Sequence, residues 1–492
     1  MQLTEALKTK DTLTENGMAT NSTSLSYCVD LFFKAGAMRA STDRDIIVAV
    51  TRSFTDDPER TLKILFWARD VRGGAGERRF FKVAFSHLAK LMPGLVNKYI
   101  HLFPVYGRWD DLLIFENTKL EAVVLPLIKG ALNNADGLCA KWMPRKGSFA
   151  NKLRKHMGFT PKQYRKMLVG LTNVVETPMC AKEYDKIDYS KVPSLAMSRY
   201  GKAFYKNDPE RFNTYVDALN NKDESVKINT GAVYPYDVVK ALKEDNKAAD
   251  AQWEALPNYL EGNTERILPL VDVSGSMDSP CGGNTTCLDV ALSLGLYISE
   301  RNEGPFKDHF LTFSADPELQ HLSGTLRQRL DQLSIAEWGM NTNMEACFDL
   351  ILKQALQHNV SEDEMPTKIL ILSDMEFDEA SGKTNNYWNE GVPEWNPTAQ
   401  ELIKNKYKEA GYKMPNIVYW NIQSRGNNVP VKFDETGTAL ISGFSPAILT
   451  GILGGSDLNP LDIMDKVIFS ERYEAVKYEG DSIYINLNKT KG

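Results

Sequence analysis

Cysteine is scarce in this sequence, and no two cysteines have the spacing of a metal or redox motif. No CxxC pair occurs among the six cysteines, which are Cys28, Cys139, Cys180, Cys281, Cys287 and Cys347. Scattered cysteines fit reduced thiols better than a disulfide framework or a zinc site. The N-terminus lacks the apolar run of a signal peptide, and no stretch approaches the roughly 20 apolar residues of a membrane span. We therefore expect a soluble, cytoplasmic protein that does not engage a membrane.

The common catalytic motifs are also missing. The sequence has no HExxH, no GxSxG and no GxxxxGK[ST] phosphate loop. The histidines form no close pair along the chain, and they are His87, His101, His156, His309, His321 and His358. These absences predict that the protein is not an enzyme.

Charge is distributed unevenly along the 492 residues. Residues 1–260 hold 39 Lys and Arg against 30 Asp and Glu, a balance of +9, and the rest holds 19 against 34, a balance of −15. The net charge of −6 therefore describes neither part. Such asymmetry indicates two surfaces with different partners.

The chain is too long for one ordinary core, and the spacing of its apolar residues changes near residue 260. After a flexible N-terminus (1–23), apolar residues recur at three- and four-residue intervals over 24–258, with short Gly, Pro and Asn breaks. This pattern predicts an α-solenoid-like domain of helical repeats, although no strict period is present. From 262 to 492, short apolar runs alternate with helical segments, which predicts a doubly wound, mostly parallel α/β domain. The expected fold is thus multidomain, α followed by α/β.

The apolar runs of the second half give its expected strands. They are RILPLVDVS (266–274), HFLTFSA (309–315), ELQHLSG (318–324), TKILILSDM (367–375) and NIVYWNIQ (416–423). Helical segments at 287–300, 344–357 and 397–411 separate them, and GTALISGF (437–444) leads into a further helical segment.

A candidate metal site follows the first of these strands. Asp272, Ser274 and Ser276 form a D-x-S-x-S string at the strand's carboxyl end, where doubly wound sheets bind ligands. Asp374 ends the second long strand, and Thr342 precedes a helix in a polar loop. Two carboxylates and three hydroxyls suit Mg²⁺ or Mn²⁺. The alternative is that Asp272 and Ser274 are ordinary capping or turn residues.

These residues resemble the metal-ion-dependent adhesion site (MIDAS) of von Willebrand factor A domains, and the resemblance spans roughly 262–492. It implies that Ser274, Ser276 and Thr342 contact the metal directly, while Asp272 and Asp374 act directly or through water. In that family the metal accepts a carboxylate from a partner, so the resemblance implies a protein partner that offers an acidic side chain.

A basic segment, 141–170, is the most conspicuous feature of the first half. It contains no Asp or Glu and nine cations, which are Lys141, Arg145, Lys146, Lys152, Arg154, Lys155, Lys162, Arg165 and Lys166. Its aromatic residues are Trp142, Phe149, Phe159 and Tyr164. Cations follow phosphates and aromatic faces stack on unpaired bases, so the segment is a candidate RNA surface. The alternative is a solvated helix face whose aromatic residues belong to the core.

A second basic string, residues 69–79, surrounds Gly73 and Gly74 with four arginines. We expect a helix C-cap followed by a turn, and contact with RNA phosphate is the alternative.

The strings WARDVRGGAGERRFF, YGRWDDLL, KWMPRKG and SDMEFD resemble a family known only as a domain of unknown function, found in bacteria, plants and large viruses. The architecture is similar, more remotely, to the Ro autoantigen (TROVE-module) proteins, in which a ring of helical repeats precedes a von Willebrand A domain and binds non-coding or misfolded RNA. This resemblance implies a ribonucleoprotein-like role, but no RNA-contacting residue can be matched position by position.

The leading hypothesis is an RNA-binding protein whose metal site recruits an acidic partner. The alternative is a protein–protein assembly scaffold that does not bind nucleic acid. A metal-dependent nuclease is the third class, and it is disfavoured because a metal held mainly by hydroxyls has no evident general base beside it.

Overall fold

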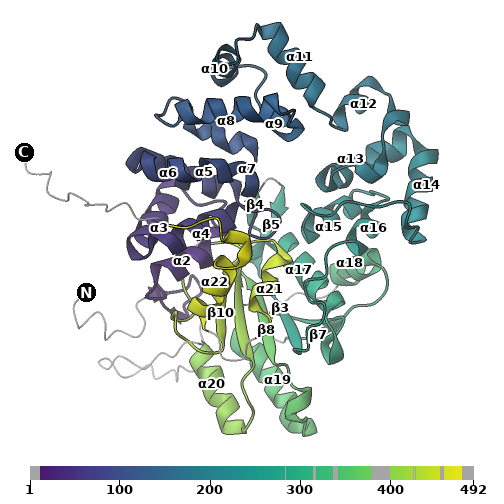
Figure 1. Ribbon diagram of the computed structural model, residues 1–492. Helices are drawn as coiled ribbons and strands as arrows, with labels where there is room; N and C mark the ends of the chain where they lie inside the picture. Colours follow the sequence, from purple (N-terminus) through teal and green to yellow (C-terminus); the bar gives the residue numbers. More distant parts are fainter. Residues whose placement is uncertain are drawn as a thin grey trace, which may run out of the picture.

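The computed structural model describes residues 12–282, 284–313, 317–335, 342–378, 399–424, 426, 428–454 and 459–478. Helices occupy the first half of the chain, and a six-stranded sheet with its own helices occupies the second (Figure 1). The predicted combination of an α half with an α/β half is confirmed. No helix within the described ranges is long and apolar enough to cross a membrane.

The helices of the first half begin where the local sequence supplies caps. Thr42 and Asp45 form a capping box at the start of α3, and Asp57 caps α4 immediately before Pro58. The α-helices are α2 (Tyr27–Ala35), α3 (Asp43–Asp56), α4 (Pro58–Arg69), α5 (Arg78–Leu91), α6 (Pro93–Tyr99), α7 (Phe103–Tyr106), α8 (Glu121–Asn133), α9 (Gly137–Trp142), α10 (Ser148–His156), α11 (Pro161–Leu171), α12 (Glu176–Ala181), α13 (Ser194–Asn207), α14 (Pro209–Asn220), α15 (Pro235–Lys243) and α16 (Ala249–Glu254).

These helices form an arch over the sheet. The chain rises from α2–α4, turns over at α10 and α11, and returns through α13 and α14 to α15 and α16 (Figure 1). The two sides meet at the base, where the Tyr234 hydroxyl donates to the Val71 carbonyl at 3.3 Å. A Cβ at Gly76, whose φ is +72°, would lie 2.2 Å from that hydroxyl. The glycine therefore lets the segment before α15 contact the loop after α4, and the arch closes on itself.

One apolar core runs through both halves. It includes Phe32 and Phe66 in the arch and Leu270 and Ile371 in the sheet, all buried. A smaller separate core surrounds Phe204 and Phe212 on α13 and α14. The hydrophobic pattern changes near residue 260, but the two patterns share one core and do not mark two independent ones.

The sheet has the strand order β10-β9-β8-β3-β6-β7. All pairings are parallel except that of β7, which is antiparallel to β6 at the edge. Central strands are buried on both faces, as expected where helices cover a parallel sheet. The strands are β3 (Ile267–Val271), β6 (His309–Thr312), β7 (Leu319–His321), β8 (Lys368–Ser373), β9 (Asn416–Asn421) and β10 (Thr438–Ser442). The α-helices are α17 (Cys287–Arg301), α18 (Leu326–Ile335), α19 (Met344–His358), α20 (Ala399–Ala410), α21 (Leu449–Ile452) and α22 (Pro460–Ile468).

The arch joins the sheet on one side through α2 and β10. The Ser442 hydroxyl donates to the Phe32 carbonyl at 2.8 Å and accepts the Gly36 amide at 3.0 Å. A Cβ on Gly36 would lie 2.6 Å from the Gly443 backbone. This approach is possible only with a glycine at the end of α2.

A buried carboxylate fixes the C-terminal turn to the same side. Asp70, at the end of α4, accepts both Nε and Nη2 of Arg472 and the Tyr473 hydroxyl. The same aspartate accepts the amide of Arg72 at 3.0 Å and so shapes the loop that Tyr234 contacts. The Asp70 side chain therefore orders both the contact with the C-terminal turn and the loop after α4.

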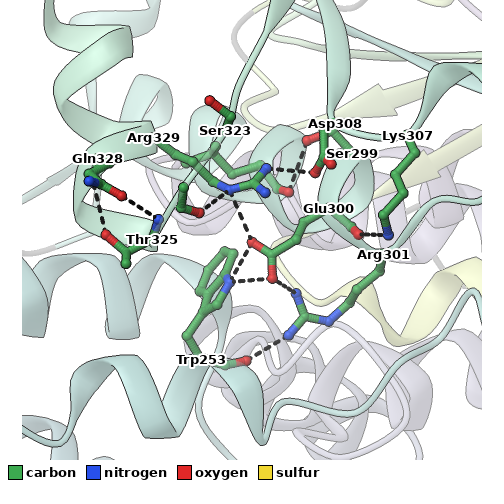
Figure 2. Close-up of polar contacts among 12 residues, drawn as sticks. Trp253, Ser299, Glu300, Arg301, Lys307, Asp308, Ser323, Thr325, Gln328 and Arg329 are labelled. Atoms are coloured by element: carbon green, nitrogen blue, oxygen red, sulfur yellow. Dashed lines mark hydrogen bonds and ion pairs between the residues drawn. The ribbon is translucent and has the colours of Figure 1, made fainter.

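The other foot of the arch stands on α17 and α18 (Figure 2). Glu300 on α17 accepts the Trp253 indole N–H with both oxygens, at 3.1 and 3.0 Å. Arg301 donates to the Trp253 carbonyl at 2.6 Å. Arg329 on α18 lies 3.9 Å from Glu300 and pairs with Asp308 at 2.7 Å. Figure 2 shows the Trp253 indole beside the Glu300 carboxylate, and Arg301 reaching the Trp253 carbonyl.

The predicted flexible N-terminus (1–23) is wrong for its described part, residues 12–23. β1 (Thr12–Leu13) pairs with β2 (Ala19–Thr20), and Met18 and Ala19 are buried. Asn21 also pairs with Val429 in the second half. The segment is ordered because it adds backbone hydrogen bonds to loops far along the chain, which a local pattern does not reveal. Residues 1–11 lie outside the described ranges.

We predict that Asp70→Asn destabilises the whole chain, because it removes the charge that Arg472 and Tyr473 share. A lost hydrogen bond to a charged group costs about 2 kcal/mol, which lowers the denaturation midpoint in urea. Lys191→Ala removes an exposed ion pair with Asp188 and is the control, with an expected change within about 0.5 kcal/mol. Equal midpoints for the two variants would contradict a central role for Asp70.

Candidate metal centre and basic surface

The candidate metal site lies where the strand order of the sheet reverses. β3 and β8 are adjacent parallel strands, with Val271 opposite Leu372, and Asp272 and Asp374 follow their carboxyl ends. From β3 the chain crosses first to β6 on one side and later to β8 on the other. The carboxyl edge at such a point is where open α/β sheets bind ligands. The pairing of β3 with β8 thus places the two aspartates on the same edge of the sheet.

Neutral donors hold the Asp272 carboxylate. It accepts the Ser274 amide at 2.9 Å and the Ser373 hydroxyl at 2.6 Å, and its side chain is fully buried. The Ser274 and Ser276 hydroxyls lie 3.0 Å apart, so the predicted string forms one compact turn. Ser276 is partly exposed to solvent, whereas Ser274 is buried, with an exposed fraction of 5%.

The turn after β8 is strained. Met375 has a backbone φ of +69°, which is rare for residues other than glycine and asparagine. The turn places the Glu376 amide 3.3 Å from Asp374 Oδ1, and Asp374 and Glu376 are both 2% exposed. Strain of this kind persists where surrounding structure holds it, and such places cluster at ligand sites.

Thr342 is attached to the same turn through Asp378. Its amide donates to Asp378 Oδ2 at 2.8 Å, and its carbonyl accepts the Asp378 amide at 3.0 Å. The side chain of Thr342 is 1% exposed. The structure therefore ties the loop of Thr342 to the loop of Asp374, which in turn lies beside Asp272.

The electrostatics of this cluster are unfavourable without a cation. Burial, and then the negative charge of Asp374, raise the pKa of Asp272 to about 6. Burial also raises the pKa of Glu376, and the nearby Asp374 and Glu15 add to the effect. Among the described residues, no Lys or Arg forms an ion pair with Asp272.

The donor set fits a hard divalent cation. Oxygen atoms of the chemistry that Mg²⁺ and Mn²⁺ prefer converge from the β3 and β8 turns, and a cation would relieve the repulsion between Asp272 and Asp374. Residues that would hold it are the five expected from the sequence: Asp272, Ser274, Ser276, Thr342 and Asp374. Among the described residues, no cluster of three or more His, Cys, Asp or Glu forms a metal site, so any cation here depends on the hydroxyls.

Residues 14–16 cover this turn, which no local pattern in the sequence predicts. The Thr14 hydroxyl donates to the Phe377 carbonyl at 2.6 Å, and the Glu15 amide donates to Glu376 Oε2 at 2.6 Å. Asn16 adds a bond to the Glu376 carbonyl at 2.7 Å. Residues 14–16 thus lie against the loop that carries Asp374.

The basic segment forms the top of the arch, in α9–α11 and their links (Figure 1). Six of its nine cations are exposed, and they are Arg145, Lys146, Lys155, Lys162, Arg165 and Lys166. Lys152 instead pairs with Glu121 at 2.7 Å, and Arg154 donates to Asn151 at 3.2 Å. Lys141 is partly buried beside Trp142. The structure therefore leaves six of the predicted residues directed to solvent.

Three of the four aromatic residues of this segment belong to the core. Phe149 and Tyr164 are buried, and the Tyr164 hydroxyl donates to the Pro144 carbonyl. Phe159 packs against the main core, and the Arg108 guanidinium lies 3.7 Å from the centroid of the partly buried Trp142 ring. The alternative interpretation of these aromatics, as core residues, is therefore correct for Phe149, Phe159 and Tyr164.

The arginine string at 69–79 is a structural junction. Arg69 pairs with the buried Asp111 at 2.7 Å, Arg78 pairs with Asp110, and Arg79 pairs with Asp43. The expected helix C-cap at Gly73 and Gly74 is wrong, because α4 ends at Arg69 and Asp70 is its C-cap. A Cβ at Gly74 would lie 1.9 Å from the Trp67 carbonyl oxygen, so the turn after the helix still needs a glycine there. Because three of the four arginines have carboxylate partners, the string does not add a free phosphate-binding surface.

Comparison with known families divides the chain at the same place as its change in apolar spacing. Residues 14–102 and 150–264 match a domain of unknown function (DUF2828), and residues 267–482 match another domain of unknown function (DUF7788). The expected resemblance to families known only by such descriptions is confirmed in this form.

One curated relative and one solved structure illustrate the similarity over the full length. An uncharacterized protein (L728) of Acanthamoeba polyphaga mimivirus is 29% identical over 96% of this chain and 90% of its own length. The crystal structure of the Deinococcus radiodurans RO (RSR) protein is similar with a TM-score of 0.39 and 13% identity, over 94% of this chain and 96% of that one.

We predict that Asp272→Asn stabilises the metal-free protein at pH 7.5. Because the folded-state pKa of Asp272 is raised, its ionised form costs stability above about pH 6, and the cost disappears as the pH falls toward its unfolded value near 4. In EDTA, the melting temperature of the variant should therefore exceed that of the parent at pH 7.5 and approach it at pH 5.

Asp278→Asn is the control, since Asp278 is exposed in the same turn. A variant at Asp272 that melts below the parent at pH 7.5 would show that the carboxylate is stabilising without a cation.

Proposed function

We propose that the chain binds structured RNA through the top of its arch and a divalent metal through the turn at Asp272. The observation that carries the first part is the set of six exposed cations on and beside α10 and α11, in a segment of thirty residues without a carboxylate. Uncompensated surface cations attract phosphate and release the counterions that surround it. In the other basic string of the arch, residues 69–79, carboxylates pair with the arginines, as at Arg69 and Arg78.

The surface favours phosphate contacts over base stacking. Proteins that bind unpaired bases present aromatic faces to them. Here Phe149 and Tyr164 are buried, and the face of Trp142 is occupied by Arg108. Recognition at the top of the arch would therefore depend on the backbone of a folded RNA, with little reading of sequence.

For the second part, we propose a von Willebrand A-type domain that carries Mg²⁺ or Mn²⁺. Supporting features are the strand order with one antiparallel edge strand, the compact turn of Ser274 and Ser276, and the tie of Thr342 to the loop of Asp374. When bound, the metal would supply a Lewis-acidic position for an anionic ligand, and a carboxylate of a protein partner is the proposed ligand. We propose binding and not catalysis, since no described histidine lies in this cluster to serve as a general base.

A scaffold that binds only protein is the second candidate, and the opposite charges of the two halves favour it. The exposed cations could contact an acidic surface, including the second half of another copy of the chain. RNA binding and protein capture respond to the same surface substitutions, so the ligand retained by the parent distinguishes the two functions.

We predict that replacing Lys155, Lys162, Arg165 and Lys166 with Ala weakens RNA binding and reduces its salt dependence. Each lost phosphate contact should lower the slope of log K against log salt by about 1, so the slope falls by about 3–4. Filter binding of a stem–loop RNA across a salt series measures both quantities. Lys152 is left unchanged because its substitution would break the pair with Glu121.

The matched control removes four other exposed lysines of the arch, Lys202, Lys206, Lys227 and Lys247. An equal loss in the two variants would mean that binding follows total charge and not the proposed surface. Absence of RNA binding by the parent would reject the RNA function.

We predict that Mg²⁺ raises the melting temperature of the parent and not that of Asp272→Asn. A cation at a hundred times its Kd contributes about 2.7 kcal/mol to a folded state that alone binds it. Thermal denaturation with and without MgCl₂ measures the effect, and Asp278→Asn should respond as the parent does. A Mg²⁺ response that survives Asp272→Asn would place the cation elsewhere.

A further inference from the structure

Two histidines that are distant from the candidate metal centre face each other at the edge of the sheet. His309 begins β6 and His321 ends β7, and the antiparallel pairing sets them directly opposite. Their ring centroids lie 4.6 Å apart. The sequence suggested no close pair of histidines, because twelve residues separate these two and only the strand pairing joins them.

The position in the ladder explains the close approach. The Leu322 amide donates to the Asp308 carbonyl at 3.0 Å, so residues 308 and 322 form a hydrogen-bonded pair. Hydrogen-bonded and non-hydrogen-bonded pairs alternate along antiparallel strands, which makes His309 and His321 a non-hydrogen-bonded pair, with their side chains closer together.

A hydrogen bond determines the tautomer of the His309 ring. Nδ1 of His309 lies 2.6 Å from the Lys307 carbonyl oxygen. A carbonyl oxygen can only accept, so Nδ1 carries the proton and Nε2 of the neutral ring keeps its lone pair. Metal-binding histidines usually show this arrangement, in which the second ring nitrogen donates to a carbonyl or carboxylate.

The separation of the rings fits two ligands on one cation. With a Zn–N bond of about 2.1 Å and a ring radius of about 1.2 Å, imidazoles about 90–110° apart on one ion have centroids about 4.7–5.4 Å apart. The observed 4.6 Å lies just below this range, close to the right-angled arrangement. His321 is exposed and His309 is partly exposed, so an ion can reach them from solvent.

We propose that His309 and His321 form a binding site for a transition-metal ion of the Zn²⁺, Cu²⁺ or Ni²⁺ class. Imidazole suits these ions, whereas the oxygen donors at Asp272 suit Mg²⁺ or Mn²⁺. No third His, Cys, Asp or Glu of the described chain completes a cluster with the pair, so water or a partner's donor fills the other positions. Because β7 pairs with β6 alone among the described strands, a bound ion would fasten this edge strand to the sheet.

Calorimetric titration of the full-length protein with ZnCl₂, in millimolar MgCl₂ to occupy the hard site, tests the proposal. The parent should bind one Zn²⁺ at this site, and His309→Ala and His321→Ala should each weaken that binding about tenfold or more. His358→Ala, at an exposed histidine of α19, and Asp272→Asn should leave it unchanged.

His321→Asn keeps a polar side chain in the strand pair and separates loss of a ligand from loss of structure. Its melting temperature without Zn²⁺ should equal that of the parent, while its Zn²⁺ affinity should match that of His321→Ala. Parent-like Zn²⁺ affinity in the His309 and His321 variants, or loss of Zn²⁺ binding in Asp272→Asn, would overturn the proposal.

Discussion

The organisation of this molecule depends on the buried carboxylate of Asp70. An ionised group that is removed from water must be paired, and Asp70 finds its partners in Arg472 and Tyr473, some four hundred residues along the chain. The same carboxylate accepts the Arg72 amide and so shapes the loop that Tyr234 contacts when the arch closes. Nearby, Glu77 is equally buried and pairs with Arg39 at 2.6 Å. The first turn of the arch, its last segment and the C-terminal turn are therefore mutually dependent, which is why the core is continuous across the change in apolar spacing.

Much of the second half could be predicted from the sequence because its signals are local. Runs such as TKILILSDM are apolar throughout, and a strand buried on both faces needs nothing else. The rule that ligands bind at strand carboxyl ends then places Asp272 and Asp374 together once the strands are recognised. By contrast, α18 and α22 were not expected, and the order of residues 12–23 was missed. Residues 12–23 owe their order to distant partners, as in the pairing of Asn21 with Val429, and no periodicity records such partners. The buried face of α22 is periodic, so its pattern is present in the sequence.

The basic and aromatic residues of the arch show a second limit of local patterns. In the sequence, Trp142, Phe149 and Tyr164 alternate with cations and suggest a stacking surface. The structure buries Phe149 and Tyr164, because each ring gains more from apolar contact than from exposure and a helix turns its periodic apolar positions inward. Trp142 is only partly buried, and Arg108 covers its ring. The same reasoning separates Lys152 from Lys155. Both are basic, but only the neighbours of Lys152 include Glu121. A charge pattern thus identifies the surface, while the structure determines which of its cations can reach a ligand.

The charge split also bears on what the proposed metal at Asp272 would accept. The half that carries this turn has a balance of −15, which includes the buried carboxylates of Asp374 and Glu376 in the turn itself. A polyanion such as RNA must approach against that field, whereas a single carboxylate on a protein pays a smaller electrostatic cost. The exposed cations lie at the top of the arch, away from the sheet (Figure 1). The carboxyl edge of the sheet, which carries Asp272 and Asp374, lies at the base of the arch, where the end of β10 contacts α2. An RNA held at the top of the arch and an acidic partner at the metal would consequently contact different parts of the molecule.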